Sequence, residues 1–146
     1  MDSVDLKLLK MLNGNAHISL NKMGREVGLS TSGIRRRIKQ LEKHGLITKY
    51  SALVDPKKYG YSVVAFVNVD VDSRTMHELI RSLVRHHEVC ELHRTTGAHT
   101  LMIKVRAKDI DSLNKFVDEH VQSFDSVKSV QTTLVMNTLK ETLLNL

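Results

Sequence analysis

The sequence has few of the residues that mark secreted or membrane proteins. Its 146 residues include one cysteine, one proline and no tryptophan, and only 4% are aromatic. A single cysteine, Cys90, excludes an internal disulfide framework, and no apolar run approaches the roughly 20 residues that span a bilayer. The N-terminus lacks the basic-then-apolar order of a signal peptide. We therefore expect a cytoplasmic protein that has no membrane partner and is packed mainly by Leu, Ile, Val and Met.

Positive charge is in excess and unevenly distributed. The chain has 22 Lys and Arg against 16 Asp and Glu, a formal net charge of +6. Lysines and arginines gather between Lys22 and Lys49, where the only acidic residues are Glu26 and Glu42. This balance favours a polyanionic partner, with nucleic acid the first candidate. The length of 146 residues suits one large domain or two small ones, and the apolar share of 41% is enough for a core.

The first 45 residues show the pattern of three short helices. Asp2 or Ser3 can begin the first helix, and Gly14 can end it in a left-handed turn. Ser19 and Ser30 are suited to cap the second and third helices, which only the tight turn after Val27 separates. Each of the three helices has an apolar stripe. In chain order the stripes are Val4, Leu8, Met11 and Leu12; Leu20, Met23 and Val27; and Ile34, Ile38 and Leu41. Two helices joined by a glycine turn predict a helix-turn-helix. The β-forming segment LITKYSALVDP, 46–56, predicts a wing of one or two strands beside it.

Three consecutive arginines lie inside the third helix. Because Ile34 and Ile38 mark the buried side, Arg35, Arg36 and Lys39 are predicted to lie opposite it and Arg37 toward a flank. The exposed face of this helix would enter the major groove of double-stranded DNA, N-terminal end first. The predicted DNA-contacting residues are Ser30, Thr31, Ser32, Arg35, Arg36, Arg37 and Lys39. The simpler alternative is a solvated charged face.

The second half of the chain reads strand, helix, strand twice. The apolar positions of its two helices coincide at a shift of 37, with Met76 matching Leu113 and Val84 matching Val121. This duplication predicts an α+β architecture in which the winged helix-turn-helix precedes a ferredoxin-like βαββαβ sandwich. Strands are expected at 62–71, 89–96, 101–107 and 127–136, with helices capped by Ser73 and Asp109. The first strand is apolar on both faces while helices cover one, which predicts a homodimer.

With these segments placed, the chain resembles the Lrp/AsnC family of transcriptional regulators. The resemblance is carried by VDLKLLKML, VGLSTSGIRRRIKQLEKHGLI, YSALVDPKKYGY and HRTTGAHTLMIKVRAKD. It implies a winged helix-turn-helix DNA-binding domain at 1–55, a linker at 56–61, and a ligand-sensing and oligomerisation domain at 62–146. It also implies a sequence-specific regulator that forms dimers, possibly octamers, and binds a small amino acid between C-terminal domains.

The resemblance also implies where the effector would bind. The implied effector-binding residues are Thr96, Gly97, Ala98, His99 and Thr100, with Thr132 and Thr133 of a neighbouring subunit. The family often has an acidic residue where this chain has Thr100, so a fixed negative charge for an α-ammonium group is missing there. It often has Pro-Gly where this chain has Asp125-Ser126, a difference confined to a turn.

The sequence gives less support to metal binding, catalysis or RNA binding. Residues of metal-binding type gather at His86, His87, Glu88, Cys90, Glu91, His93 and His99, but no spacing matches a closed zinc site, so no metal is expected. Cys90 is predicted to pack with Leu92. With no catalytic motif and no cofactor signature, we do not expect an enzyme. The alternative function is a metabolite-binding or enzymatic ferredoxin-like protein whose basic N-terminal half is incidental; RNA binding would need exposed aromatic residues that the chain lacks.

Overall fold

A computed structural model describes residues 1–144 and 146, and the chain divides into two compact units. The first comprises Met1–Leu53 with Glu141–Leu146, and the second comprises Val54–Lys140. The sequence analysis assigned the last residues of the chain to the second domain, at 62–146, whereas here Glu141–Leu146 group with the first unit. In the part of the chain that is described, no helix is long and apolar enough to cross a membrane.

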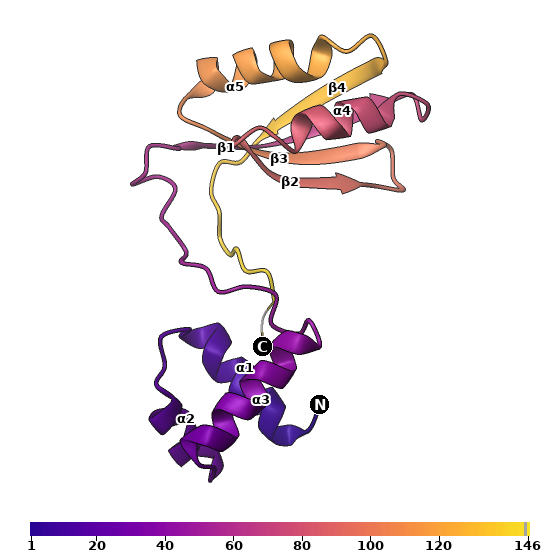
Figure 1. Cartoon of the computed structure of the whole chain (residues 1–146). Helices are drawn as coiled ribbons and strands as arrows, with labels where there is room; N and C mark the ends of the chain where they lie inside the picture. The colour runs from indigo at the N-terminus through magenta and orange to yellow at the C-terminus, as the bar shows by residue number, and fades with distance from the viewer. Residues whose placement is uncertain (145) are drawn as a thin grey trace. The chain divides into compact units, whose positions relative to one another are not determined.

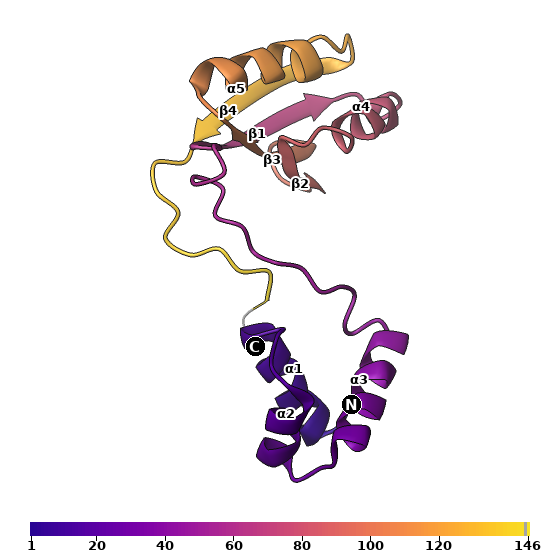
Figure 2. The same cartoon turned by 60° about the vertical axis from the view of Figure 1, so that its left-hand side comes forward.

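Three helices form the first unit: α1 (Ser3–Gly14), α2 (Leu20–Val27) and α3 (Thr31–Lys43). Each contributes one nearly inaccessible side chain to a shared core, Leu8 from α1, Met23 from α2 and Ile34 from α3. Figure 2 shows α2 and α3 joined by a short turn. Each core residue comes from one of the predicted stripes, so the helical periodicity is confirmed.

The helix ends follow local chemistry. Asp2 begins α1 in a reciprocal capping box with Asp5, and the hydroxyls of Ser19 and Ser30 each accept from a backbone N–H of their own helix. These caps satisfy donors that a first turn would otherwise leave unpaired. The predicted left-handed turn at Gly14 is wrong. Gly14 is the last helical residue, but its φ is not positive; Asn15 follows it in an extended conformation, and its N–H donates to the Met11 carbonyl.

The prediction of strands in the wing is wrong for this chain. No strand lies between the end of α3 and Val63, a stretch that is described throughout. Leu53 is 99% exposed and Tyr50 is half-exposed, with the Tyr50 hydroxyl donating to Glu42. A strand needs a neighbour to accept its backbone hydrogen bonds, and among the described residues no strand pairs with this segment. The segment therefore has a β-forming composition but forms no strand.

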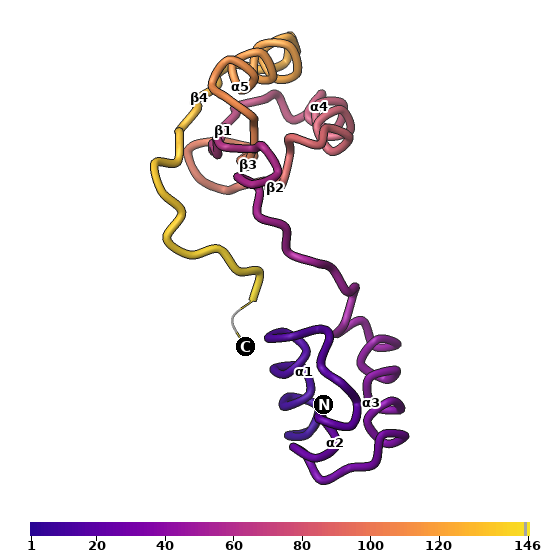
Figure 3. Tube along the Cα trace, turned by 90° about the vertical axis from the view of Figure 1, so that its left-hand side faces the viewer, coloured from indigo at the N-terminus to yellow at the C-terminus, as the bar shows by residue number. Residues whose placement is uncertain are grey.

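The second unit has the predicted ferredoxin-like order. Its sheet is antiparallel with strands in the order β2-β3-β1-β4, and both helices lie on the same side of it (Figures 1 and 3). The elements are β1 (Val63–Val71), α4 (Met76–Leu83), β2 (Val89–Arg94), β3 (Leu101–Ala107), α5 (Ile110–Val117), the π-helical turn η1 (Asp118–Gln122) and β4 (Val127–Leu134).

The core of this unit lies between the sheet and its helices. The alternate residues of β1 that face the helices are buried, and they pack with apolar residues of α4, α5 and β3; the β1 set is Ala65, Val67, Val69 and Val71. Asp109 caps α5 as predicted. The predicted cap at Ser73 is wrong, because Met76 already donates to the Asp72 carbonyl and α4 begins after Thr75. On the other face of β1, Val64 and Phe66 stay only half-buried.

Candidate nucleic-acid interface and effector turn

The outer face of α3 carries the side chains that the sequence selected. Arg35, Arg36 and Lys39 are exposed, while Ile34 is buried at the α1 and α2 contact. None of the three cations has an ion-pair partner among the described residues, so their charge is available to an external anion. The helical spacing thus places them as predicted, whereas their contact with DNA is not tested by the geometry.

The start of α3 supplies small polar groups. Ser30, Thr31 and Ser32 are all exposed. The Ser30 hydroxyl accepts from the backbone N–H of Gly33 at 3.2 Å and lies 3.0 Å from the Ser32 hydroxyl. The Ser30 hydroxyl is therefore partly engaged in capping. Backbone N–H groups at a helix start, with small side chains around them, can approach a phosphate closely.

Arg37 is placed differently from its two neighbours. Its Nη1 atom lies 2.7 Å from Asp2 Oδ2 and 2.7 Å from Asp5 Oδ1. The pKa of each of these carboxyls is held below the usual 3.8, first by the backbone N–H of the other aspartate and then by Arg37. The two carboxylates in turn raise the pKa of Arg37. The third arginine of the run thus joins α3 to the beginning of α1.

The turn between α2 and α3 depends on two glycines. Gly28 has a φ of 71°, a left-handed conformation that favours glycine. Gly24 is buried, and a Cβ atom there would lie 2.5 Å from the Leu29 carbonyl oxygen. That carbonyl is backbone and cannot move aside without opening the turn. The sequence reasoning missed Gly24; its signal was a glycine in the middle of an otherwise helical pattern.

The predicted effector residues of the β2–β3 connection form a hydrogen-bonded turn. The Thr100 hydroxyl donates to the Val69 carbonyl at 2.9 Å and accepts from the Val71 N–H at 3.0 Å. The Thr95 hydroxyl donates to the His99 carbonyl. Thr100 is therefore committed to fastening the turn to β1, while Thr96, Gly97 and Ala98 are exposed at its tip.

An acidic residue that the sequence analysis did not select, Asp70, lies beside this turn. Asp70 Oδ2 is 3.1 Å from His99 Nδ1 and accepts from the Ser129 hydroxyl at 2.5 Å. The Ser129 hydroxyl first, and His99 second, lower the pKa of Asp70. The other imidazole nitrogen of His99 lies 3.1 Å from Gln131 Oε1. Strand alternation could have found Asp70, because it faces away from the core and pairs with Ser129.

The two predicted threonines of β4 are not brought to the turn within one chain. Thr132 pairs with Val67 and Thr133 with Phe66, whereas the turn adjoins β1 at Val69. Both threonines are exposed, and neighbouring strand residues point to opposite faces. An effector site that used both the turn and these threonines would need a second subunit, as the resemblance implies.

The cluster of metal-binding residue types is dispersed. Among the described residues, no group of three or more His, Cys, Asp or Glu is arranged to hold a metal ion. His93 lies 3.1 Å from Glu91 on the same face, but His99 turns to Asp70 instead. The prediction that Cys90 packs with Leu92 is wrong, since Cys90 is exposed. The pairing of β2 with β3 shifts register between Val89 and Glu91, which breaks the alternation behind that prediction.

Comparison with known proteins agrees with this arrangement. Two family models match: winged helix-turn-helix DNA-binding over residues 1–48 and Lrp/AsnC ligand binding domain over residues 64–144. The HTH-type transcriptional regulator Ptr1 of Methanocaldococcus jannaschii is 37% identical over 141 residues, covering 97% of this chain and 95% of its own length. The HTH-type transcriptional regulator FL11 of Pyrococcus horikoshii is 34% identical over 142 residues, with coverage of 97% and 93%.

Solved structures give the same match over the whole chain. E. coli AsnC has a TM-score of 0.93 and 28% identity, covering 99% of this chain and 97% of that one. A transcriptional regulator of Neisseria meningitidis, solved as a complex with L-Met, has a TM-score of 0.93 and 26% identity, with coverage of 98% and 94%.

Proposed function

Because the chain belongs to the Lrp/AsnC family of transcriptional regulators, we propose that it reads specific DNA sequences with α3 and responds to a small amino acid. Membership of this family makes it a regulator with a helix-turn-helix and a ligand-binding domain, and not an enzyme. This argues against the alternative of an enzymatic ferredoxin-like protein. The finer proposals concern the base-reading residues, the effector and the assembly.

The observation that supports DNA reading is the exposed pair Arg35 and Arg36 near the N-terminal end of α3. An arginine can hold guanine through two parallel hydrogen bonds or clamp a phosphate. Ser30, Thr31 and Ser32 would position the helix start against the DNA backbone, and Lys39 would hold a further phosphate. Arg37 is occupied by Asp2 and Asp5, so we assign it to supporting α3 and not to reading bases.

Footprinting of the purified protein on genomic fragments tests this proposal. We expect a defined protected sequence, and binding that falls on the order of a thousandfold between 50 and 200 mM salt if six or more phosphates are held. Weak binding that is indifferent to sequence, or a flat response to salt, would contradict it.

The open face of the sheet supports a homodimer. Helices cover only one face, while Val64, Phe66 and Met102 present half-buried apolar surface on the other. A second copy of the same sheet would bury this surface. The dimer would then bind two half-sites about one helical turn apart, or a multiple of it. The family resemblance implies that such dimers associate further into octamers, and light scattering measures the size of the assembly.

The β2–β3 turn supports an effector site shared between subunits. Exposed backbone at Gly97 and Ala98 can approach a carboxylate closely, and Thr132 and Thr133 of a neighbour would complete the polar lining. The Asp70 carboxylate would supply the negative charge that the Thr100 position lacks. Hydrogen bonds with Ser129 and His99 fix its orientation. The L-Met complex of the Neisseria relative supports an amino acid as ligand. Calorimetry with the common amino acids, alongside DNA binding, tests it.

A further inference from the structure

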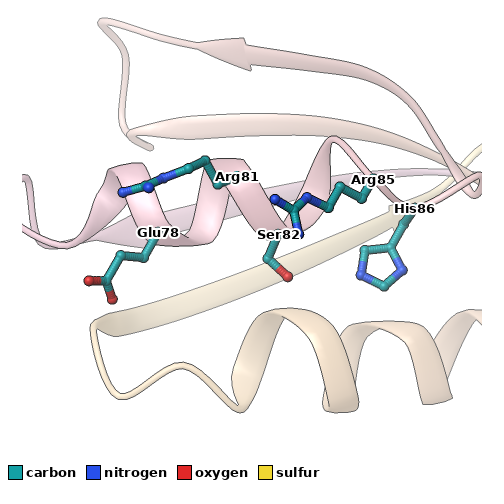
Figure 4. A pocket seen from close by; sticks show the side chains of 5 residues that line it. All are labelled: Glu78, Arg81, Ser82, Arg85 and His86. Carbon is teal, nitrogen blue, oxygen red and sulfur yellow. The ribbon is translucent and has the colours of Figure 1, made fainter.

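The exposed side of α4 carries a group of polar side chains that neither DNA reading nor the effector turn uses. They line a pocket of about 600 Å³ and are Glu78, Arg81, Ser82, Arg85 and His86. In Figure 4 the side chains of Glu78, Arg81 and Ser82 extend from α4, and those of Arg85 and His86 extend from the segment that follows it. The His86 ring lies at one end of the group and the Glu78 carboxylate at the other. None of these five residues belongs to the effector turn at 96–100.

The two arginines of this pocket, which we call the α4 pocket, lack acidic partners. Arg81 lies in α4, and Arg85 lies two residues beyond its end at Leu83. Among the described residues, no carboxylate lies within ion-pair distance of either guanidinium, although both side chains are exposed. Two cations on one surface without a counter-charge would attract an anion.

His86 gives the pocket one fixed wall. Its ring meets Phe116 edge-on with 5.6 Å between ring centroids, and it lies against His120 at 4.1 Å. Contacts with α5 and η1 therefore restrict the imidazole, which is half-buried. A ring held in one orientation loses little freedom when it binds a ligand, which favours binding. Ser82, also half-buried, adds a hydroxyl between the two arginines in the sequence.

We propose that the α4 pocket binds the phosphate group of a small phosphorylated metabolite. Guanidinium, imidazole and hydroxyl groups supply several donors to one phosphate, and hydrogen bonds between ionised partners are the strong ones. The volume exceeds what inorganic phosphate needs and suits a ligand of small-metabolite size. Glu78 lies beyond the cations, where its carboxylate accepts hydrogen bonds from hydroxyl or amino groups on the rest of the ligand. This site is separate from the amino-acid site and does not depend on it.

Titration calorimetry on the full chain tests the proposal with three probes: adenosine monophosphate, adenosine and inorganic phosphate. We expect adenosine monophosphate to bind more tightly than inorganic phosphate and adenosine not to bind. The double substitution Arg81→Ala with Arg85→Ala should weaken phosphate binding about tenfold or more, the effect of losing a charge-assisted hydrogen bond. His86→Asn, which keeps a polar side chain of similar reach, should weaken it less.

Arg74→Ala is the matched control. Arg74 is an exposed arginine just before α4, with its guanidinium near Asp72 and outside the pocket. Its loss should leave binding unchanged, and equal thermal unfolding of all variants would show that each one folds. The proposal is wrong if neither phosphate probe binds, or if the double variant binds them as the parent does. It is also wrong if the double variant loses salt-dependent DNA binding instead, because the arginines would then hold DNA phosphates.

Discussion

The Arg37 guanidinium donates to the Asp5 carboxylate at 2.7 Å, and this ion pair joins the third helix to the first. It divides the run of three arginines into two functions. Arg35 and Arg36 project into solvent, while Arg37 is half-buried against α1. A cation held by two carboxylates would have to lose both before it could hold a DNA phosphate. The position of α3, on which DNA reading would depend, is thus supported by an arginine within the run itself.

Replacing Arg37 with alanine should lower the melting temperature at neutral pH yet keep the preferred DNA sequence. The pKa of Asp5 is lowered below 3.8 in the folded chain, so its contribution to stability is complete above 3.8 and disappears as pH falls through the lower folded value. The difference in stability between parent and variant should therefore shrink in acid below pH 3.8. Thermal unfolding across pH measures it, with Arg36→Ala as control. A changed footprint with unchanged stability would show that Arg37 reads DNA.

Replacing Gly24 with alanine should destabilise the helix-turn-helix. The new Cβ would lie 2.5 Å from the Leu29 carbonyl oxygen, and forcing an extra carbon into a packed turn costs about 1–3 kcal/mol. Gly14→Ala is the matched control, because a Cβ there meets nothing within 4 Å; it should be neutral or stabilising by about 0.4–1 kcal/mol. Denaturant unfolding compares the two. Equal stabilities would mean that the turn opens without cost.

Base reading should depend on Arg35 or Arg36. If one of them holds a guanine, its replacement by alanine should cost about 1–3 kcal/mol of binding and relax the preference at one base position. Lys43, exposed at the C-terminal end of α3, is the control, and its loss should weaken binding to all sequences alike. Binding to a library of operator variants separates these outcomes. If both arginine variants keep full preference, another element reads the bases.

Periodicity predicted the helices and the sheet because each buried face repeats at a fixed spacing. The stripe that includes Ile34 and the alternation from Ala65 to Val71 both follow this rule. The predictions of the wing strands and of the packing of Cys90 were wrong, because both depend on a pairing partner that residue spacing does not reveal. The β-forming segment after Gly45 has no strand to pair with, and Cys90 is exposed because the β2 register shifts beside it.

In the candidate sites, too, spacing predicted which side chains are exposed but not which distant residues they contact. The exposed positions of Arg35 and Arg36 follow from helical geometry alone. The ion pairs of Arg37 with Asp2 and Asp5 join residues more than 30 positions apart, and sequence spacing carries no information about such a contact. For Asp70, strand alternation indicates the outward face, but its partners His99 and Ser129 come from two other segments, which spacing does not reveal.

Replacing Phe66 with aspartate should disrupt the dimer. Phe66 lies on the sheet face that the helices leave open, and an aspartate there would bury a charge between the two sheets, which is costly. Its neighbour on β3, Lys104, is already paired with Glu91 at 2.8 Å. Val84→Asp is the matched control, because Val84 is 61% exposed at the end of α4, on the helix side. Light scattering at micromolar concentration should give a dimer or larger for the parent and the control, and a monomer for Phe66→Asp. A parent that is monomeric would contradict assembly through the sheet.

Asp70 should decide whether the effector turn can hold an amino acid. In the proposed site its carboxylate, whose pKa Ser129 and His99 lower, would receive an α-ammonium group, and losing such a charged hydrogen bond costs roughly 1.5–3 kcal/mol, about tenfold to a hundredfold in affinity. Asp70→Asn should therefore weaken binding of whichever amino acid the parent binds, as measured by calorimetry, without weakening DNA binding in the absence of ligand. Asp72→Asn is the control, since Asp72 bonds to Arg74 outside the turn.

A second substitution tests the turn independently of charge. Apart from its two chain neighbours, no heavy atom of the described residues lies within 4 Å of a Cβ built at Gly97, so Gly97→Trp should fold normally and fill the space that a ligand needs. Amino-acid binding should then be abolished while basal DNA binding persists, because the indole would occupy the ligand position and the substitution leaves the sequence of α3 unchanged. If the parent binds no common amino acid, and none changes its assembly or DNA affinity, the chain regulates without this effector and the charge of Asp70 serves only to fasten His99 to β1. If an amino acid binds and survives both substitutions, its site lies elsewhere in the domain.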